Sequence, residues 1–545
     1  MFADGRSVPS GEVIQTSVCV IGGGAAGLAI ARELGAAGLE VVLLERGPDR
    51  GPAKPPDTVL NVGLPYDLDD SRWFEVGGAL QRWRVHTPLG RGFGRMRELE
   101  AIDFERRDWV PHSGWPFAKD HLDPFYARAR KMFDTPWPSE APEQLWDSTL
   151  DTGPFATSGL VTRVFYFSNP GVFPGPIWRS VSNSDRIVAL TNAAAVELRS
   201  HASGNAVTSL AVRTAQDHAF EVEAETYVVA AGGIEAARLL LVSRDCHVDG
   251  VGNAEGLVGR YFMEHPHYAS GQLIPASRAA FEDPSHFAIH LHGDVPLQKK
   301  YTLPEATVRQ EGLLGCTFRF EAKPVTDSDH TLRYSERALN RIDTATAAVR
   351  AAVRREQGVG PAVRASIVGA PHIARHLANR SRVRLGRARG RTRYLEPQSF
   401  WIRAMAEQVP NPDSRVRLRR DRDPLGVPLV DLDWRMTEQD RLSMGRSQDL
   451  LAAAVSRTGN RVESLLDGRE LPPALSGGMH HMGTTRMHDS PRMGVVDRHG
   501  RVHGVSNLYI AGSAVFPTVG YANPTLTLLA LSLRLADRIR SLERR

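Results

Sequence analysis

The sequence predicts an α/β fold with a Rossmann-like strand–helix–strand unit near its N-terminus. Three features support this prediction: a run of apolar residues at Val18–Ile21, a glycine-rich turn after it, and a second apolar run that ends at Glu45. A short apolar run without polar alternation is typical of a parallel strand buried on both faces. Strand, glycine turn, helix and second strand in this order indicate a dinucleotide-binding unit.

Each part of this unit has a physical role. Gly22 allows the tight turn, Gly24 lets the backbone approach a pyrophosphate, and Gly27 lets the helix pack against the strand. The expected helix, 25–37, would point its N-terminal N–H groups at the phosphates. A strand at 40–44 places the carboxylate of Glu45 where it can bind ribose hydroxyls. The alternative is a structural βαβ unit with incidental glycines. We predict a nucleotide site that includes Gly22, Gly24, Ala26, Gly27, Glu45 and Arg46.

Segments along the whole chain resemble flavoproteins. The strand ending Glu45-Arg46-Gly47, the strand from Thr226 to Gly233 and the segment from Asn507 to Ser513 resemble conserved flavoprotein segments. With His480-His-Met-Gly-Thr and Gly520-Tyr-Ala-Asn-Pro-Thr, they resemble the glucose–methanol–choline (GMC) oxidoreductase family. The match is most like the branch of pyranose oxidases and bacterial glycoside dehydrogenases or oxidases. Further matching segments are Glu75-Val-Gly-Gly, Ser113-Gly-Trp-Pro-Phe, the run from Glu407 to Val416, and Phe516-Pro-Thr.

The resemblance implies bound FAD and two interleaved domains. The FAD-binding domain would comprise residues 13–100, 186–265 and 475–545. The α+β substrate-binding domain, built on an antiparallel sheet, would comprise 101–185 and 266–474. A helix beginning at Pro524 and Thr525 would point its N-terminus at the flavin, with proline at a first-turn position. The further cofactor-binding residues expected are Gly77, Gly78, Val196, Ala231, Gly512, Ser513, Pro524 and Thr525.

The chemistry of alcohol oxidation needs a base and an orienting group. Removing a hydride from carbon is easier if the hydroxyl proton also leaves, and a neutral imidazole accepts that proton well. The resemblance assigns the base to His480 and the partner to Asn523, whose amide can orient the hydroxyl without competing for the proton. The neighbouring His481 is the alternative base. The resemblance therefore implies an enzyme that oxidises a CH–OH group of a sugar or glycoside to a carbonyl.

Two positions depart from the family pattern. Many relatives carry Asp where Gly512 stands here, so we expect backbone N–H groups to serve the ribityl-phosphate side. Some relatives attach flavin covalently through a histidine four residues after the Gly-Gly pair, and Arg82 occupies that position here. Because arginine cannot be that nucleophile, we predict non-covalent FAD, with His86 one turn further on as the residue that would overturn the prediction.

Composition is that of an ordinary globular enzyme. Hydrophobic residues make up 42% and charged residues 24% of the 545 residues. No apolar run approaches the ~20 residues that span a bilayer, and residues 1–16, with Asp4 and Glu12, lack the pattern of a secretory signal. Three scattered cysteines do not make a disulfide framework, so we expect a cytoplasmic protein.

Two other sequence features, a cluster of basic residues and a motif of metal-ligand residue types, could indicate other functions. Arginines crowd into Arg375–Arg393, which could attract a nucleic acid, an acidic substrate or a membrane surface, or be a solvated face. The net charge is only +5 and aromatic residues are not interleaved, so we expect no nucleic-acid partner. Glu264-His-Pro-His267 has metal-ligand residue types but no second cluster, so we predict no metal.

Two other functions stay open at this point. One is oxidation of a non-sugar alcohol, such as an aliphatic, aryl or natural-product hydroxyl. The other, from a different class, is a flavin-binding module without catalysis, against which the intact His480 and Asn523 argue. The sequence does not indicate the oligomeric state, or whether oxygen or a quinone-like molecule accepts the electrons.

Overall fold

The computed structural model describes most of the chain. Described are residues 2–49, 58–82, 85–87, 90–133, 154–155, 157–277, 281, 287–292, 295–322, 399–468, 470–472 and 474–543. The chain divides into two compact units, residues 1–273, 283–321 and 401–545, and residues 274–282 and 322–400. The elements given below belong to the first unit apart from a few terminal residues. The arginine-rich stretch 375–393 lies outside the described residues.

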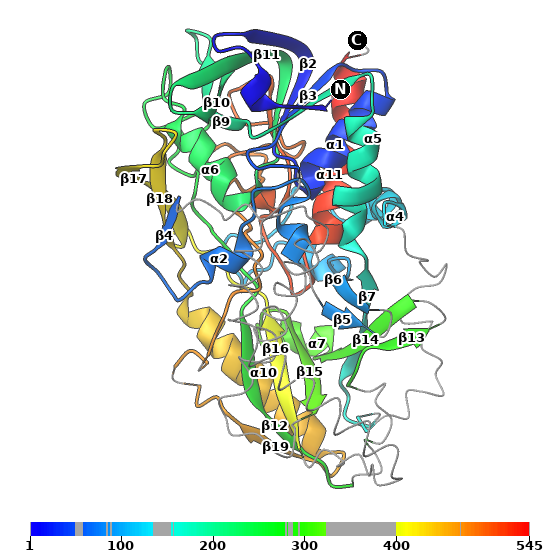
Figure 1. Ribbon diagram of the computed structural model, residues 1–545. Helices are drawn as coiled ribbons and strands as arrows, with labels where there is room; N and C mark the ends of the chain where they lie inside the picture. The colour runs from blue at the N-terminus through cyan, green and yellow to red at the C-terminus, as the bar shows by residue number, and fades with distance from the viewer. Residues whose placement is uncertain are drawn as a thin grey trace, which may run out of the picture. The chain divides into compact units, whose positions relative to one another are not determined.

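The first sheet is mainly parallel and combines strands from the N-terminal and C-terminal parts of the chain (Figure 1). The order of its parallel strands is β1, β8, β3, β2, β11, β20, where β20 pairs with the second half of β11. The first half of β11 pairs with β10, and β10 pairs with β9, both in antiparallel fashion. Val20 of β2 stands between Leu43 of β3 and Val228 of β11, so the apolar runs in the sequence form the buried centre. The strands are β1 (Phe2–Asp4), β2 (Val13–Ile21), β3 (Val41–Leu44), β8 (Ile187–Thr191), β9 (Ala194–Ser200), β10 (Val207–Ala215), β11 (His218–Val229) and β20 (Leu508–Ile510).

Helices from distant parts of the sequence cover this sheet. The N-terminal helix α1 (Ala25–Ala36) and the C-terminal helix α11 (Thr525–Glu543) pack side by side, with α5 (Trp178–Ser182) against α1 and α4 (Asp123–Lys131) against α11. Figure 1 shows this group on the right of the sheet and α6 (Gly232–Val242), which contacts β9, on the left. The largest apolar core lies between these helices and the sheet.

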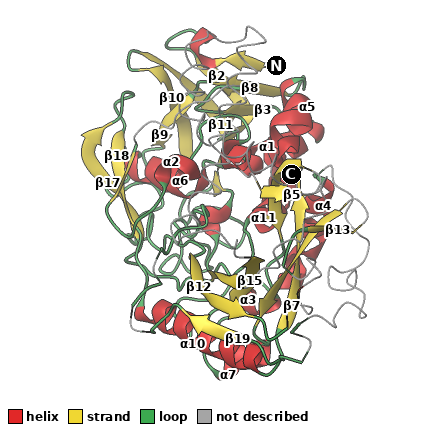
Figure 2. Ribbon diagram, turned by 60° about the horizontal axis from the view of Figure 1, so that its bottom comes forward, coloured by secondary structure: helices red, strands yellow, loops and turns green. Residues whose placement is uncertain are grey.

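The second sheet is larger, and its strands β5, β6, β7, β13, β14 and β15 pair with one another in antiparallel fashion. Its order is β19, β12, β16, β15, β14, β7, β6, β5, with β13 paired to β14. Helix α10 (Glu438–Ser456) contacts β19 and runs beside this sheet, as Figure 2 shows. The strands are β5 (Val85–Thr87), β6 (Gly90–Met96), β7 (Val161–Ser168), β12 (His267–Ile274), β13 (His290–His292), β14 (Val295–Thr302), β15 (Cys316–Ala322), β16 (Phe400–Ala406) and β19 (Arg461–Ser464).

Smaller elements complete the described part of the chain. A third sheet has the order β17, β18, β4. Its strands and the short helices are β4 (Val59–Asn61), β17 (Arg415–Arg422), β18 (Pro428–Asp433), α2 (Leu68–Ser71), α3 (Ala101–Phe104) and α7 (Glu305–Gln310). Not one helix in the described ranges combines the length and apolar character that crossing a bilayer requires.

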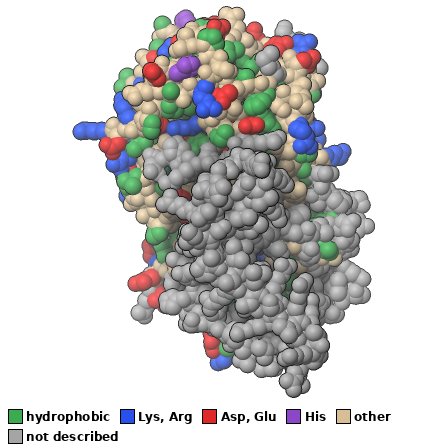
Figure 3. Space-filling model, viewed as in Figure 1, with side chains coloured by type: hydrophobic (Ala, Val, Ile, Leu, Met, Phe, Trp, Pro, Cys, Tyr) green, Lys and Arg blue, Asp and Glu red, His purple; other side chains and the backbone are tan. Residues whose placement is uncertain are grey.

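The predicted fold class is confirmed: a Rossmann-like parallel sheet is combined with a largely antiparallel second sheet. The strands of the first sheet fall almost entirely within the ranges expected for the nucleotide-binding domain. Strands β5 and β6 belong to the second sheet although they lie within 13–100. The division into two domains stays a prediction. On the face in Figure 3, basic and acidic side chains of the described residues are interspersed.

Candidate active site

The glycine turn after β2 is shaped by close backbone contacts. Gly22 has φ +111, and a Cβ there would lie 2.6 Å from the Ala230 carbonyl oxygen. A Cβ on Gly27 would lie 1.9 Å from the Gly22 carbonyl oxygen, so only glycine allows α1 to pack this close to the turn. A Cβ on Gly24 would meet no atom within 4 Å. Gly24 therefore leaves open the space in front of the helix N-terminus.

Glu45 is buried behind this turn. The backbone N–H groups of Gly23 and Gly47 donate to its carboxylate, at N···O distances of 2.8 and 2.7 Å. Burial raises the pKa of Glu45 to about 6. The carboxylate thus holds the glycine turn in place, and its expected bond to ribose hydroxyls stays a prediction.

One cavity brings the predicted residues together from distant stretches of the chain. It extends from the glycine turn to the start of α11, and all the predicted site residues except Gly27 and Asn523 line it. Asn523 comes directly before Pro524, which does line it. The lining residues from the prediction are Gly22, Gly24, Ala26, Glu45, Arg46, Gly77, Gly78, Val196, Ala231, His480, Gly512, Ser513, Pro524 and Thr525.

His480 and Asn523 lie together at the edge of this cavity. His480 Nε2 is 3.4 Å from Asn523 Nδ2, and both residues are buried. On the other side of the ring, His480 Nδ1 is 2.9 Å from Nδ1 of His265. Asn523 Oδ1 has no hydrogen-bond partner within the described part of the chain. The imidazole Nε2 and the amide Nδ2 therefore face the same small region, where a hydroxyl ligand could contact both.

The backbone around His480 is held by one buried carboxylate. Glu264 accepts the N–H groups of Gly478 and His480, at 2.8 and 2.6 Å, and the Tyr66 hydroxyl. Between these two residues Met479 has φ +64, a left-handed conformation that is uncommon outside glycine. Burial raises the pKa of Glu264 to about 8. Glu264 thus pins a strained turn whose next residue is His480.

Comparison with known families agrees with this geometry. Residues 410–532 match the family model described as GMC oxidoreductase, and residues 17–251 match the one described as FAD dependent oxidoreductase. The chain is a GMC oxidoreductase. The resemblance found in the sequence is confirmed, and with it an FAD-dependent enzyme that acts on CH–OH donors.

Curated relatives and solved structures extend over nearly the whole of this GMC oxidoreductase. It is 24% identical to the fructose dehydrogenase large subunit of Gluconobacter japonicus, over 97% of this chain and 98% of the relative. It is 26% identical to paromamine 6'-oxidase of Streptomyces fradiae, over 96% of this chain and 91% of the relative. A fungal aryl-alcohol oxidase structure superposes with a TM-score of 0.56 at 15% identity, over 97% of this chain and 99% of that one, which shows the shared fold.

The cavity of this GMC oxidoreductase suits FAD. Open space lies where a Cβ would project from Gly24, Gly232 and Gly512, so backbone can approach a ligand closely along the cavity. The N-termini of α1 and α11 both reach it, and a helix N-terminus favours negative charge. Gly24 and α1 would hold the pyrophosphate, and the start of α11 would face the flavin ring.

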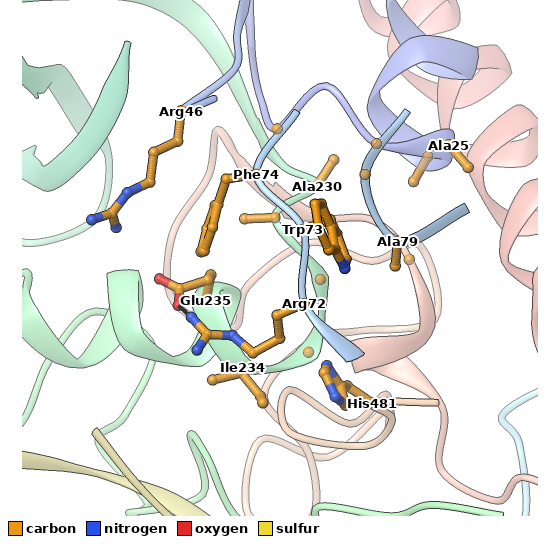
Figure 4. Close-up of a pocket in the computed structure, with 18 of the residues that line it drawn as sticks. Ala25, Arg46, Arg72, Trp73, Phe74, Ala79, Ala230, Ile234, Glu235 and His481 are labelled. Carbon is orange, nitrogen blue, oxygen red and sulfur yellow. Dashed lines mark hydrogen bonds and ion pairs between the residues drawn. The ribbon is translucent and has the colours of Figure 1, made fainter. Parts of the chain in front are cut away.

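A network of buried charges along the cavity was missed by sequence reasoning (Figure 4). Arg72 and Arg238 both pair with Glu235, and Arg238 also pairs with Asp423, which binds Arg46 at 2.9 Å. Burial would raise the pKa of Glu235, but the two arginine charges outweigh it and hold this pKa at about 2. The sequence feature that could have indicated these ion pairs is the spacing of Glu235 and Arg238, three residues apart in the otherwise apolar helix α6.

Phe74 lies beside this network. The guanidinium carbons of Arg46 and Arg72 are 5.1 and 5.3 Å from the centre of its ring, as the side chains in Figure 4 illustrate. A charged and aromatic wall therefore forms this part of the cavity.

The imidazoles near the site are held neutral by burial. Burial, together with neighbouring histidines, lowers the pKa of His480 well below its usual range. It lowers the pKa of His265 to about 4 and of His481 to about 3. A neutral His480 is ready to accept a proton at neutral pH. His481 also lines the cavity, and Ser513 Oγ donates to its carbonyl oxygen at 2.8 Å.

Lys300 of β14 is a buried amine near these histidines. Its Nζ is 4.0 Å from the Phe165 ring centre and 3.9 Å from Met405 Sδ, and no carboxylate of the described residues forms an ion pair with it. Burial lowers its pKa well below the usual value. The described residues hold no group of three or more His, Cys, Asp or Glu side chains that could bind a metal ion.

Proposed function

We propose that this GMC oxidoreductase oxidises a CH–OH group of a sugar or glycoside to a carbonyl. The observation that carries the proposal is the His480–Asn523 pair at the edge of the cavity that would hold FAD. Relatives over nearly the full length are named for fructose and paromamine, a sugar and an aminoglycoside, which supports the substrate class.

His480 acts as the base. Its neutral Nε2 takes the hydroxyl proton, so that an O–H bond breaks as an N–H bond forms, while the C–H electrons leave carbon and the C=O bond completes. Asn523 Nδ2 lies 3.4 Å from His480 Nε2, so a hydroxyl oxygen placed beside the pair is within hydrogen-bond reach of both nitrogens. Bound FAD supplies the two-electron acceptor.

Asn523 orients the substrate. In the proposed complex its amide N–H donates to the reacting oxygen, which leaves the hydroxyl proton pointing at His480. Burial of both side chains excludes bulk water from this contact. Holding the reacting groups in line is expected to contribute as much as the proton transfer itself.

The test replaces the two neighbouring histidines in turn. His480→Ala should retain FAD and slow anaerobic flavin reduction by roughly 10²–10⁴-fold, the usual contribution of a general base. His481→Ala is the matched control, since its ring lines the same cavity without contacting Asn523. Loss of activity in His481→Ala with an active His480→Ala would reverse the assignment.

The substrate class is tested with anaerobic mixing of sugars, glycosides and simple or aromatic alcohols. Bleaching of the flavin by a sugar or glycoside supports the proposal. Bleaching only by a simple or aromatic alcohol would replace it with oxidation of a non-sugar alcohol, and bleaching by none would favour a flavin-binding module. Subsequent addition of oxygen or a quinone identifies the electron acceptor.

A cytoplasmic location is part of the proposal. It is supported by the three cysteines, all of which are free thiols, two of them buried. Fractionation of the producing cells with a disulfide-containing secreted marker checks it.

A further inference from the structure

His265 is a buried imidazole that the proposed reaction does not yet use. It lies in the Glu264–Pro266 segment just before β12 and is completely inaccessible to solvent. Its Nδ1 is 2.9 Å from His480 Nδ1, and its Nε2 is 3.3 Å from the carbonyl oxygen of Val519. The two rings meet edge to face, with centroids 5.0 Å apart. Val519, His265 and His480 thus form a continuous series of hydrogen-bond contacts that ends at Asn523.

The Val519 carbonyl determines which atom donates and which accepts in each of these hydrogen bonds. A backbone carbonyl can only accept, so the Val519 contact requires the proton of neutral His265 to be on Nε2. His265 Nδ1 is then a lone pair and must accept from His480 Nδ1. The proton of neutral His480 is therefore on Nδ1, and its Nε2 carries the lone pair.

We propose that His265 is a positioning residue that fixes His480 in the Nδ1–H tautomer, with Nε2 available as the base. The proposal rests on the proposed function for the role of His480, but the tautomer itself is a property of the resting protein. The position of Asn523 agrees with this tautomer, because its Nδ2, a hydrogen-bond donor, faces the unprotonated Nε2 of His480 at 3.4 Å.

The opposite tautomer fails at the carbonyl end of this series of contacts. A proton on His480 Nε2 would make its Nδ1 an acceptor, so His265 would have to donate from Nδ1. Its Nε2 lone pair would then face the Val519 oxygen, 3.3 Å away and without a proton between them. An unmade bond between buried polar groups costs roughly 1–3 kcal/mol, which favours the active tautomer by about 5- to 150-fold.

His265 is a neutral partner for His480, whereas many hydrolases hold the catalytic histidine with a negatively charged carboxylate. His480 becomes an imidazolium when it accepts the substrate proton, and His265 then offers a lone pair but no negative charge. The proton is therefore held weakly and can leave again after turnover. Other ionisable groups near the pair are Glu264 on the backbone side, His267 of β12, His481, Lys300 of β14 and Glu407 after β16.

The backbone anchor of His480 is separate from this series of contacts. Glu264 accepts the backbone N–H groups of both His480 and His265, whereas the proposed role of His265 runs through its ring. A change at the ring of His265 therefore leaves the position of the His480 backbone intact. This separation makes the tautomer role testable.

The test compares His265→Leu with His265→Gln in the FAD-loaded protein. Leucine fills the space without a nitrogen, whereas the glutamine carbonyl can accept from His480 Nδ1 while its amide donates to Val519. His201→Leu, at an exposed turn after β9, controls for the loss of a histidine. FAD content and thermal unfolding establish that each variant is folded.

The first readout is ¹⁵N NMR of histidine-labelled protein without substrate, with His480 assigned from His480→Gln. We expect an unprotonated Nε2 and a protonated Nδ1 in the wild type, and tautomer averaging in His265→Leu alone. A wild-type spectrum with the proton on His480 Nε2 overturns the proposal. This readout needs no turnover, so failure of the proposed function leaves it standing.

The second readout is anaerobic flavin reduction as a function of pH and substrate concentration. We expect His265→Leu to lower the limiting rate by roughly 10²–10⁴-fold, the range of a misplaced base proton, with KM within about threefold. His265→Gln should regain at least tenfold of that loss, and His201→Leu should lose nothing. A His265→Leu rate equal to wild type, or an equal loss in the glutamine variant, overturns the proposal.

Discussion

Gly24 and Gly27 stand three residues apart in the same turn, yet we expect their alanine variants to fail in opposite ways. In Gly27→Ala the new methyl carbon would lie 1.9 Å from the Gly22 carbonyl oxygen, about 1.5 Å inside ordinary contact distance. Both atoms are fixed by the backbone, so α1 must move away from β2 or the turn must open. Overpacking costs roughly 1–3 kcal/mol when side chains can adjust. We expect at least about 3 kcal/mol here, more than a 100-fold change in the folding equilibrium.

In Gly24→Ala the methyl group meets no protein atom within 4 Å and φ is −75, which alanine adopts without strain. The free energy of unfolding of the apoprotein should therefore change by less than about 0.5 kcal/mol. The methyl group instead projects into the cavity where backbone must approach the pyrophosphate. We expect a loss of FAD affinity of at least tenfold, about 1.4 kcal/mol.

The assay separates the two effects by measuring them on different states. Urea unfolding of the apoprotein reports stability without the contribution of bound ligand, and titration with FAD followed by flavin fluorescence reports affinity. Gly38→Ala, at an exposed turn after α1 with φ +92, measures the cost of backbone strain at a glycine outside the cavity and should leave FAD affinity unchanged. A Gly27→Ala apoprotein as stable as wild type, or normal FAD affinity in Gly24→Ala, would refute the reasoning.

Two further predictions concern the cofactor bond and a buried cation. Because Arg82 stands where some relatives carry the linking histidine, acid precipitation should release the yellow colour into the supernatant, and colour kept in the pellet would show a covalent bond. Lys300→Met should raise the free energy of unfolding near pH 7, since it removes a buried amine that lacks an acidic partner in the described ranges. The folded pKa of Lys300 lies below the ordinary 10.5, so between these values the unfolded chain binds the extra proton and wild-type stability rises with pH. The gain from Lys300→Met should therefore shrink toward pH 10.5 in urea titrations, and a constant gain would contradict the lowered pKa.

Local patterns explain what could be predicted from the sequence. The expected helix 25–37 is observed as Ala25–Ala36, and the strand expected at 40–44 is observed as Val41–Leu44. Both depend on a run of apolar residues and a glycine turn, which act within a few residues. The family motifs at His480 and Asn523 likewise indicated a site formed by both ends of the chain, and the structure brings those ends together.

Long-range packing explains what could not. The residue types in Glu264-His-Pro-His267 indicate at most a metal site, because nothing local shows that His265 contacts His480, more than two hundred residues later in the sequence. The carboxylate of Glu45, whose contact with a ribose stays a prediction, also accepts two backbone N–H groups, which a sequence pattern does not reveal. The ion pairs of Glu235 depend on how α6 meets the segments around Arg72 and Asp423, and no spacing predicts that meeting.

The pairing of β11 with β20 has a consequence for how the chain is made. The second half of β11 ends at Val229, and its parallel neighbour begins at Leu508, so the ribosome must add roughly 280 residues before that edge is covered. At typical synthesis rates the wait is roughly 15–60 s. An uncovered strand edge is a template for aggregation throughout that time. A stop codon anywhere in this interval would release a chain that has the glycine turn but lacks the His480–Asn523 pair, and that leaves the edge of β11 unpaired and prone to aggregation.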